Sequence, residues 1–180
     1  MPALEREKIM IEAPIPADED ERLHALRQLL ILDTPPEERF DRIVTFASQE
    51  FDMPMVLITL VDADRQWFKA SVGLNVCETA RDVSFCGHAI LSDETMVVSD
   101  ATKDQRFFDN PLVIAEPHVR FYVGAPLTLP SGQNVGTLCL IDSSPRDMDA
   151  IGLAILSSLR DLVVEELINQ ETLSDENHGI

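Results

Sequence analysis

Three cysteines and His88 are the side chains of this sequence best suited to metal or thiol chemistry. Cys86 and His88 are separated by a single glycine, whereas Cys77 and Cys139 lie elsewhere in the chain. A Cys and a His two positions apart hold a metal ion only together with about two further ligands. Cys77 and Cys139 are the available candidates, but nothing in their spacing brings them near, so we predict no metal site. The odd and sparse cysteine count favours a reduced, cytosolic protein without a disulfide framework.

Two interpretations are open for each of these side chains. A cysteine in the first turn of a helix has a lowered pKa because the helix dipole favours the thiolate, so Cys86, or else Cys77, is a candidate for redox sensing. The alternative, which we favour, is that Cys86 and Cys139 are small core residues. His88 is either a neutral hydrogen-bonding group for a ligand or a structural residue bonded to a backbone carbonyl.

Hydrophobic periodicity predicts the elements that must position these residues. The predicted helices cover residues 18–32, 35–51, 84–91 and about 144–170, and the predicted strands cover residues 55–61, 65–70, 95–100, 120–129 and 134–141. Thr34 is expected to cap the second helix, with Glu37 completing a capping box. Ser84 is expected to cap the third helix. Residues 101–118 form a long connection with one helical turn near residues 104–108, and long ordered connections are often binding elements.

The order of these elements indicates an α+β domain. Consecutive antiparallel strands are joined as hairpins, and the helices are grouped at both ends of the chain. In the strand over residues 65–70, alternation sends Gln66 and Phe68 to one face and Trp67 to the other, where Trp67 is expected to pack in a core. We expect a flexible acidic leader over residues 1–17, one domain over residues 18–170, and an acidic flexible tail over residues 171–180.

The charge balance excludes several classes of partner. The 180 residues include 14 Lys and Arg against 32 Asp and Glu, for a formal net charge of −18. Without a Lys/Arg-rich patch, neither nucleic acid nor an anionic membrane is an expected partner. Half of the excess belongs to the two ends, with −4 over residues 1–20 and −5 over residues 165–180. With no apolar run of about 20 residues and no signal peptide, the sequence predicts a cytoplasmic protein.

Six strings of residues, in this order, resemble the GAF domain family. They are LITLVD at 57–62, RQWFK at 65–69, SFCGHAI at 84–90, DQRFFDNP at 104–111, RFYVGAPL at 120–127 and GTLCLID at 136–142. The resemblance covers roughly residues 20–165 and is closest to the bacterial sensory subgroup found ahead of histidine kinase or diguanylate cyclase modules. It implies a central antiparallel β-sheet, with the N- and C-terminal helices on one face and a ligand pocket on the other.

The motifs of better characterised subgroups do not match. The Asn-Lys-Phe-Asp-Glu signature of cyclic-nucleotide-binding members is absent. Bilin-binding members commonly place a histidine directly after the attachment cysteine, whereas Gly87 separates Cys86 from His88 here. The flanks of Cys77 and Cys86 are unlike those of the free methionine sulfoxide reductases. No cofactor is therefore predicted, although an unidentified small ligand is expected.

The resemblance places a set of candidate ligand-binding residues around the pocket. Its walls would be the short helix from Ser84, the loop over residues 102–117 and the strand from Arg120. The candidates are Ser84, Cys86, His88, Asp100, Arg106, Phe107, Arg120 and Tyr122. Between residues 21 and 164 there are ten Arg and only two Lys, and the guanidinium fork suits carboxylate or phosphate.

This arginine content supports one sharper hypothesis. Arg120, with Arg106 or Arg81, would hold an anionic small ligand. The alternative is that these arginines pair structurally with Asp100 and Asp109.

The sequence thus predicts a standalone sensory or regulatory domain that binds a small molecule or a partner protein without catalysis. One alternative is a thiol enzyme of the free methionine sulfoxide reductase type, and the other is an interaction module whose pocket is filled by its own side chains. The last helix is apolar over more than one face, through Met148, Ile151, Ile155, Leu159 and Leu162. With the resemblance, this pattern predicts a homodimer through the terminal helices and a separate signalling output protein.

Overall fold

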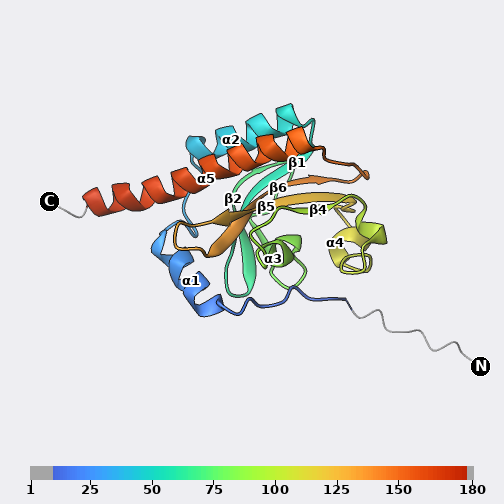
Figure 1. Cartoon of the computed structure of the whole chain (residues 1–180), viewed down its shortest axis with the longest axis horizontal. Coiled ribbons are helices and arrows are strands. Elements are labelled where there is room, and N and C mark those ends of the chain that lie inside the picture. The colour runs from blue at the N-terminus through green and yellow to red at the C-terminus, as the bar shows by residue number, and fades with distance from the viewer. Residues whose placement is uncertain (1–9, 178–180) are drawn as a thin grey trace, which may run out of the picture.

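The computed structural model describes residues 10–177, with side chains as far as residue 169, and contains one six-stranded antiparallel sheet (Figure 1). The strand order is β3-β2-β1-β6-β5-β4. The strands are β1 (Met55–Val61), β2 (Arg65–Val72), β3 (Glu78–Ala80), β4 (Met96–Val98), β5 (Phe121–Thr128) and β6 (Asn134–Asp142). The helices are α1 (Glu19–Gln28), α2 (Glu38–Glu50), α3 (Phe85–Ala89), α4 (Pro111–Ile114) and α5 (Ala150–Asn177), with a 3-10 turn η1 (Ala101–Lys103).

The central strands are apolar on both faces, and each face has its own core. In β1, Val56, Ile58 and Leu60 point to one core, while Met55 and Leu57 point to the other. Side chains alternate between the faces of a strand, so a continuously apolar strand must be covered on both sides. The two predicted hairpins, β1–β2 and β5–β6, are confirmed by their pairing.

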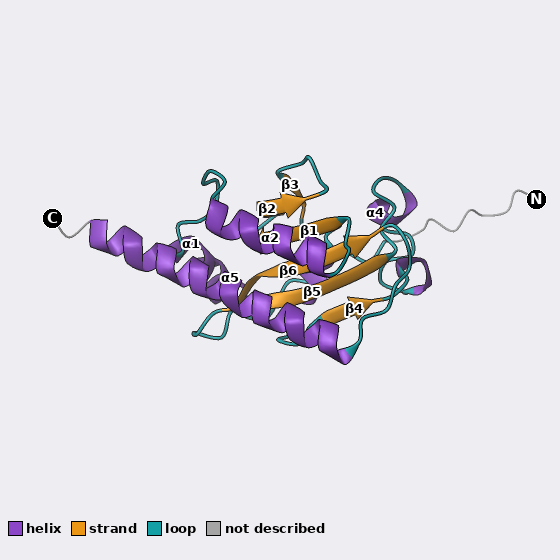
Figure 2. Ribbon diagram, turned by 90° about the horizontal axis from the view of Figure 1, so that it is seen from above, coloured by secondary structure: helices purple, strands orange, loops and turns teal. Residues whose placement is uncertain are grey.

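The helices at the two ends of the chain cover one face of this sheet. Figure 2 shows α2 and α5 side by side over the strands. Leu26 of α1 and Leu29, the C-cap residue of α1, belong to the same core as the buried residues of α2 and α5. Arg39 of α2 donates a hydrogen bond of 2.7 Å to the backbone carbonyl of Glu166 in α5, which ties the two helices together. The predicted α+β architecture is confirmed.

The opposite face is covered by the short helices and the long connection. Phe85, Cys86 and Ala89 of α3 pack on Tyr122 of β5 and Cys139 of β6, in the second core. Ser84 caps α3 as predicted, because its Oγ accepts a hydrogen bond of 3.0 Å from the backbone N–H of Gly87.

Helix α2 starts later than predicted, and the expected capping box does not form. Glu37 occupies the N-cap position, and the Thr34 hydroxyl donates to the Ile31 carbonyl instead. Pro36 is the physical reason, because a residue that precedes a proline is kept out of the helical region, here Pro35. The extended segment that results binds Lys69, whose ammonium group donates to Thr34 Oγ1 at 2.8 Å.

Other boundaries also differ from the sequence prediction. Strand β3 lies in a stretch expected to be loop, and the connection over residues 101–118 contains η1 and α4 in addition to the predicted helical turn at 104–108, where the backbone N–H of Phe108 donates to the Asp104 carbonyl at 2.9 Å. Helix α5 begins at Ala150 rather than near residue 144, and it extends past residue 170 to Asn177. In the expected leader, Ala13 is buried and its backbone N–H donates to the Asp82 carbonyl. The remainder of the expected leader and tail, residues 1–9 and 178–180, lies outside the described residues.

None of the helices in residues 10–177 is long and apolar enough to cross a membrane.

Candidate functional site

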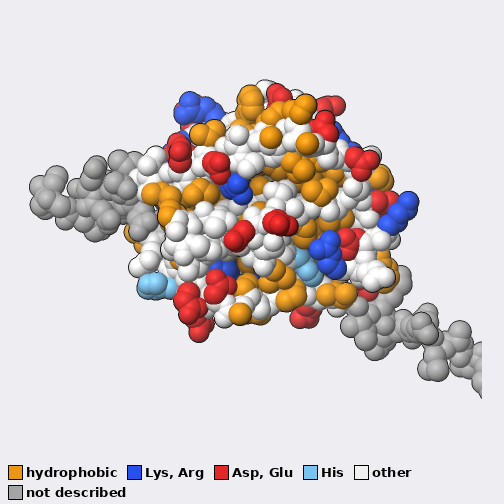
Figure 3. Space-filling view, viewed as in Figure 1, with side chains coloured by type: hydrophobic (Ala, Val, Ile, Leu, Met, Phe, Trp, Pro, Cys, Tyr) orange, Lys and Arg blue, Asp and Glu red, His pale blue; other side chains and the backbone are white. Residues whose placement is uncertain are grey.

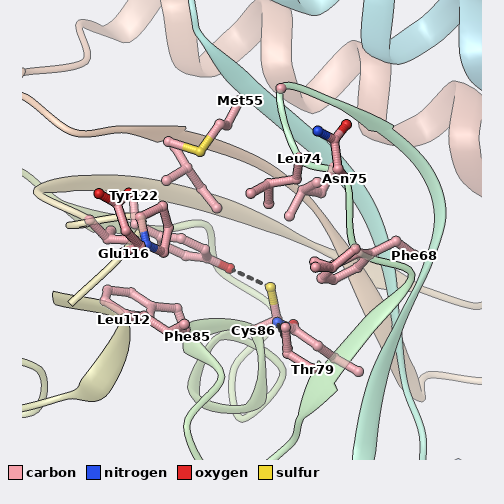
Figure 4. A pocket seen from close by; sticks show the side chains of 17 residues that line it. Met55, Phe68, Leu74, Asn75, Thr79, Phe85, Cys86, Leu112, Glu116 and Tyr122 are labelled. Atoms are coloured by element: carbon pink, nitrogen blue, oxygen red, sulfur yellow. Dashed lines mark hydrogen bonds between the residues drawn. The ribbon is translucent and has the colours of Figure 1, made fainter.

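A cavity of about 470 Å³ lies on the face of the sheet opposite α2 and α5 (Figure 4). Strands β1, β2 and β5 form its floor, α3 and α4 form one side, and the loop that follows β2 forms another. Most of the lining is apolar, including Met55, Leu57, Phe68, Leu74, Phe85 and Leu112. Cavities of this size and character are typical of small-molecule sites.

The cavity opens to solvent at one rim. Asn75 and Val76, in the loop after β2, and Glu116, in the loop after α4, all line it and are all exposed. Figure 4 shows Asn75 and Glu116 on opposite sides of the cavity. A small molecule therefore has a path from solvent to the buried floor.

Gln66 is the polar group of the floor whose hydrogen bonding is incomplete. Its side-chain N–H donates to Thr79 Oγ1 at 2.7 Å, while its Oε1 atom is buried and has no partner within the described part of the chain. A buried acceptor without a donor is costly. The mainly apolar lining is suited to a molecule that is itself mainly apolar.

Cys86 forms the junction between the cavity and the core beneath it. Its Sγ atom lies 3.1 Å from the Tyr122 hydroxyl and 3.1 Å from Thr137 Oγ1, which donates to it. Thr137 Oγ1 is in turn 3.0 Å from Thr59 Oγ1 on the neighbouring strand. Behind these groups, Cys139 Sγ is 3.9 Å from Cys86 Sγ.

This network separates the pKa values of its members. Burial raises the pKa of the Cys86 thiol, but hydrogen bonds led by those from Cys139, Thr137 and Tyr122 lower it by more, to about 7. Burial and the neighbouring Cys86 raise the pKa of Cys139 well above its ordinary value. The pKa of Tyr122 is raised in the same way. Any thiolate in this cluster therefore forms at Cys86.

His88 and Phe107 lie one layer away from the cavity. Phe107 stacks on Phe85 with 4.0 Å between ring centroids, and His88 packs edge-on against Phe107 at 4.8 Å. Burial, with a contribution from Arg106, lowers the pKa of His88, so its ring is neutral. His88 contributes a hydrogen bond with the backbone of Ile11, which favours the structural interpretation of this histidine.

Two of the predicted polar residues outside the wall cap helical segments. Ser84 caps α3, and Asp100 caps η1 by accepting from the backbone N–H of Thr102 at 3.0 Å. Of the eight candidates, Cys86 and Tyr122 line the cavity, whereas the other six lie outside its lining.

The three arginines expected to hold an anion do not converge on the cavity. Arg81 pairs with Glu19, Arg106 pairs with Asp104 at 2.8 Å, and the guanidinium of Arg120 donates to backbone carbonyls of residues 113 and 119. Their hydrogen-bond partners differ from the Asp100 and Asp109 that the sequence suggested, although Arg120, after the hydrogen bond from Thr102, helps to lower the pKa of Asp100. The residues that line the cavity, all within the described chain, include no Arg or Lys.

Most of the residues that line the cavity were not predicted from the sequence as site residues. Strand alternation placed Gln66 and Phe68 on one face, and this is confirmed, as is the packing of Trp67 in the other core. Leu112, Glu116 and Pro117 belong to the segment over residues 102–117 that the resemblance named as a wall of the pocket. The loop with Leu74 was not among the predicted walls. Cys77 is exposed, and no group of three or more His, Cys, Asp or Glu within residues 10–169 is placed to bind a metal ion.

The model of the GAF domain family matches residues 35–167. This chain belongs to the GAF domain family. The sheet, its covering helices and the cavity on the free face are therefore those of a GAF domain.

Three similar proteins illustrate the range of this GAF domain's relatives. A cyclic di-GMP phosphodiesterase from Pseudomonas aeruginosa is 46% identical over 137 residues, which are 76% of this chain but 23% of that protein. The GAF domain of an Acinetobacter phosphoenolpyruvate-protein phosphotransferase superposes with a TM-score of 0.63 at 19% identity, over 86% of this chain and 98% of that one. A type II free methionine-R-sulfoxide reductase from Thermoplasma acidophilum gives 0.60 at 14% identity, over 72% and 89%.

Proposed function

We propose that this GAF domain is a non-catalytic sensory module that binds a small, uncharged and mainly apolar molecule in its cavity. The observation that carries the proposal is the cavity itself, which is open at one rim and mainly apolar in its lining. A ligand with an aromatic or aliphatic body fits this lining. The three free cysteines suit a reducing compartment, and we place the domain in the cytoplasm.

The charge of the lining argues against the reductase alternative. Glu116, at the exposed rim, is the charged residue of the lining, and no cation accompanies it within the described chain. A free amino acid such as methionine sulfoxide carries a carboxylate, which binds most strongly to an arginine or lysine. Among the described residues, the cavity offers that carboxylate no Arg or Lys, and the charge at its rim is negative. We therefore favour binding without turnover.

Strand β5 connects the cavity to α5. Tyr122 faces the cavity, while its neighbours Phe121 and Val123 face the core beneath α2 and α5. A ligand that shifts β5 therefore also shifts the surface on which α5 packs. We propose that α5 carries the signal to an output protein, as in the subgroup that precedes histidine kinase or diguanylate cyclase modules. The chain spans about a quarter of the length of the Pseudomonas phosphodiesterase. By analogy with that protein, we propose that the output protein controls the turnover of cyclic di-GMP.

A second copy of the chain is the proposed partner of the outer face of α5. Leu156, Leu159 and Val163 are buried against the sheet, whereas Ile151 and Leu162 are 72% and 47% exposed. The predicted apolar seam thus divides, because Leu159 packs inward and Ile151 and Leu162 point outward. An apolar helix face of this kind suits a symmetric dimer.

The ligand proposal is tested with two substitutions on α4. Leu112 lines the cavity, and Ile114, two residues later, is 58% exposed and lies outside the lining. Leu112→Trp fills the cavity, and Ile114→Trp makes the same addition at the surface. Freshly purified protein is examined by native mass spectrometry, and its thermal unfolding is followed with neutral aromatic compounds, carboxylates and nucleotides. We expect a neutral compound to bind the wild type and Ile114→Trp one-to-one and to lose at least tenfold in affinity for Leu112→Trp.

Three results would contradict the proposal. Binding confined to the anions would restore the arginine hypothesis. No binding, with a crystal structure in which the domain's own side chains fill the cavity, would favour an interaction module. Thiol-dependent turnover of methionine sulfoxide that Cys86→Ala or Cys77→Ala abolishes would establish the enzyme.

A further inference from the structure

Two buried cysteines face each other beneath the cavity. The Sγ atoms of Cys86, on α3, and Cys139, on β6, are 3.9 Å apart, and both side chains are almost fully buried. Cys86 belongs to the cavity lining, whereas Cys139 lies behind it. In Figure 4 the Cys86 sulfur points inward, toward the Tyr122 hydroxyl. A small molecule in the cavity therefore reaches Cys86 before it reaches Cys139.

We propose that Cys86 and Cys139 form a reversible disulfide when a hydroperoxide enters the cavity, which makes the domain a thiol-based peroxide sensor. The Cys86 thiolate attacks the terminal oxygen of the hydroperoxide; an S–O bond forms, the O–O bond breaks, and the alkoxide or hydroxide leaves and takes a proton. Cys86 is then a sulfenic acid. The Cys139 sulfur attacks it, the S–S bond forms, and the hydroxyl group departs as water with the Cys139 proton. In total the two thiols lose two electrons. An organic hydroperoxide becomes an alcohol and one water, and hydrogen peroxide becomes two waters.

The surroundings of Cys86 favour the first step. Thr137 Oγ1 donates to its sulfur, and the Tyr122 hydroxyl lies at the same distance of 3.1 Å. Donors that surround a sulfur stabilise the thiolate, which is the reactive form. The lowered pKa of Cys86 and the raised pKa of Cys139 agree with this assignment of attacking and resolving thiols.

The second step needs only a small local movement. A disulfide has an S–S distance of about 2.05 Å, so the two sulfurs must approach by about 2 Å. Cys139 lies on a central strand with neighbours on both sides, whereas Cys86 lies on the five-residue helix α3. Formation of the bond would require the Cys86 side chain to rotate so that its sulfur leaves Tyr122 and approaches Cys139. The bond would link α3 to β6 and change the floor of the cavity.

The exposed third cysteine has to be removed for a clear test. Cys77→Ser leaves two thiols, both buried. This variant is treated with hydrogen peroxide, denatured in an alkylating reagent, and measured by intact mass and peptide mapping. We expect the number of alkylated thiols to fall from two to none, with the loss of two hydrogen atoms, one cross-link between residues 86 and 139, and full recovery in dithiothreitol. Leu112→Trp in the same background should slow the reaction at least fivefold, and Ile114→Trp should not.

A control separates the two steps. In Cys77→Ser with Cys139→Ala, Cys86 should gain one oxygen atom and be trapped by a sulfenic-acid reagent. Two thiols that remain alkylatable at peroxide concentrations that oxidise Cys77 in the wild type would overturn the proposal. So would oxidation of Cys86 to the sulfinic acid without a cross-link in the Cys77→Ser protein. The result is independent of the ligand measurements, because it is read from covalent mass alone.

Discussion

Glu19 joins two arginines that are almost completely withdrawn from water. Arg22 and Arg81 are 1% and 3% exposed, and Glu19 accepts hydrogen bonds from both guanidinium groups. Arg22 also donates to the Val61 carbonyl at 2.6 Å, and Arg81 donates to the Asp62 carbonyl at 3.0 Å. The cluster thereby fixes α1 to the β1–β2 turn and to the segment that leads into α3. A buried charge without its partner is strongly destabilising, so Glu19 is central to this junction.

We predict that Glu19 makes the stability of the domain pH-dependent. Burial raises the pKa of Glu19, but hydrogen bonds from Arg81 and Arg22 lower it by more, from an ordinary 4.5 to about 2. A carboxylate with a depressed pKa in the folded state contributes stability above pH 4.5, and that contribution is lost as the pH falls toward 2. Glu19→Gln should lower the free energy of unfolding by about 2 kcal/mol at pH 7. Urea unfolding from pH 7 to pH 2.5 measures both effects.

The control is Glu21→Gln, in the same first turn of α1 but exposed. It should change the stability by less than about 0.5 kcal/mol at every pH. The difference in the free energy of unfolding between the two variants should be large at pH 7 and should decrease below pH 4.5. An equal gap at pH 7 and pH 3 would show that Glu19 acts through packing and not through its charge.

The sequence could predict the faces of residues but not their distant partners. Alternation correctly separated Gln66 and Phe68 from Trp67, because that pattern is local to one strand. The arginines were harder to interpret. Arg81 meets Glu19 across 62 positions of sequence, a contact that exists only once α1 has packed on the sheet. No spacing rule reveals such a pair. Because the arginines are bound to partners elsewhere, the cavity lacks the cations that the sequence suggested.

At the scale of elements, apolar strands and hairpins were predictable from the sequence, whereas the first and last residues of elements were less so. Strand β1 is apolar apart from Thr59, β6 is mainly apolar in its second half, and the short turns between paired strands are marked by polar residues. Pro35 and Pro36 look like a helix start, yet the second proline keeps the first extended and delays α2. Strand β3 has only three residues and pairs with β2 alone, so its sequence carries no periodic signal.

We predict that β6 requires glycine at position 136. Gly136 pairs with Leu60 of β1, and a Cβ atom there would lie 1.8 Å from the Thr59 carbonyl oxygen. Backbone atoms must then move at the centre of the sheet, so Gly136→Ala should cost about 3 kcal/mol or more, or prevent folding. Gly132, in the turn before β6, has φ of +97° but open space around it. Gly132→Ala should cost only about 1 kcal/mol. Thermal unfolding of the two variants compares their losses of stability. Equal losses would contradict the close approach of Gly136 to the Thr59 carbonyl.

At the scale of the whole molecule, the charge and the apolar surface act against each other. The net charge of −18 makes two copies repel. In the space-filling view of Figure 3, acidic and basic side chains are interspersed, and hydrophobic side chains lie near the top, where Figure 1 shows α2 and α5. The outward residues Ile151 and Leu162 belong to the first half of α5, before the acids that accumulate toward its end. A dimer interface at this first half keeps the acidic ends of the two helices apart.

We therefore predict a dimer that strengthens with salt and depends on this half of α5. Light scattering after size exclusion should give about twice the chain mass of 20.1 kDa at micromolar concentration. The dissociation constant should fall as the ionic strength rises from about 0.05 to 0.5 M, because screening weakens the repulsion while apolar contact persists. Ile151→Arg combined with Leu162→Arg should give a monomer with unchanged thermal unfolding at low protein concentration. Ile114→Arg, an equally exposed change on the cavity side, should leave the dimer intact. A monomeric wild type, or dissociation by both sets of variants alike, would exclude α5 as the interface.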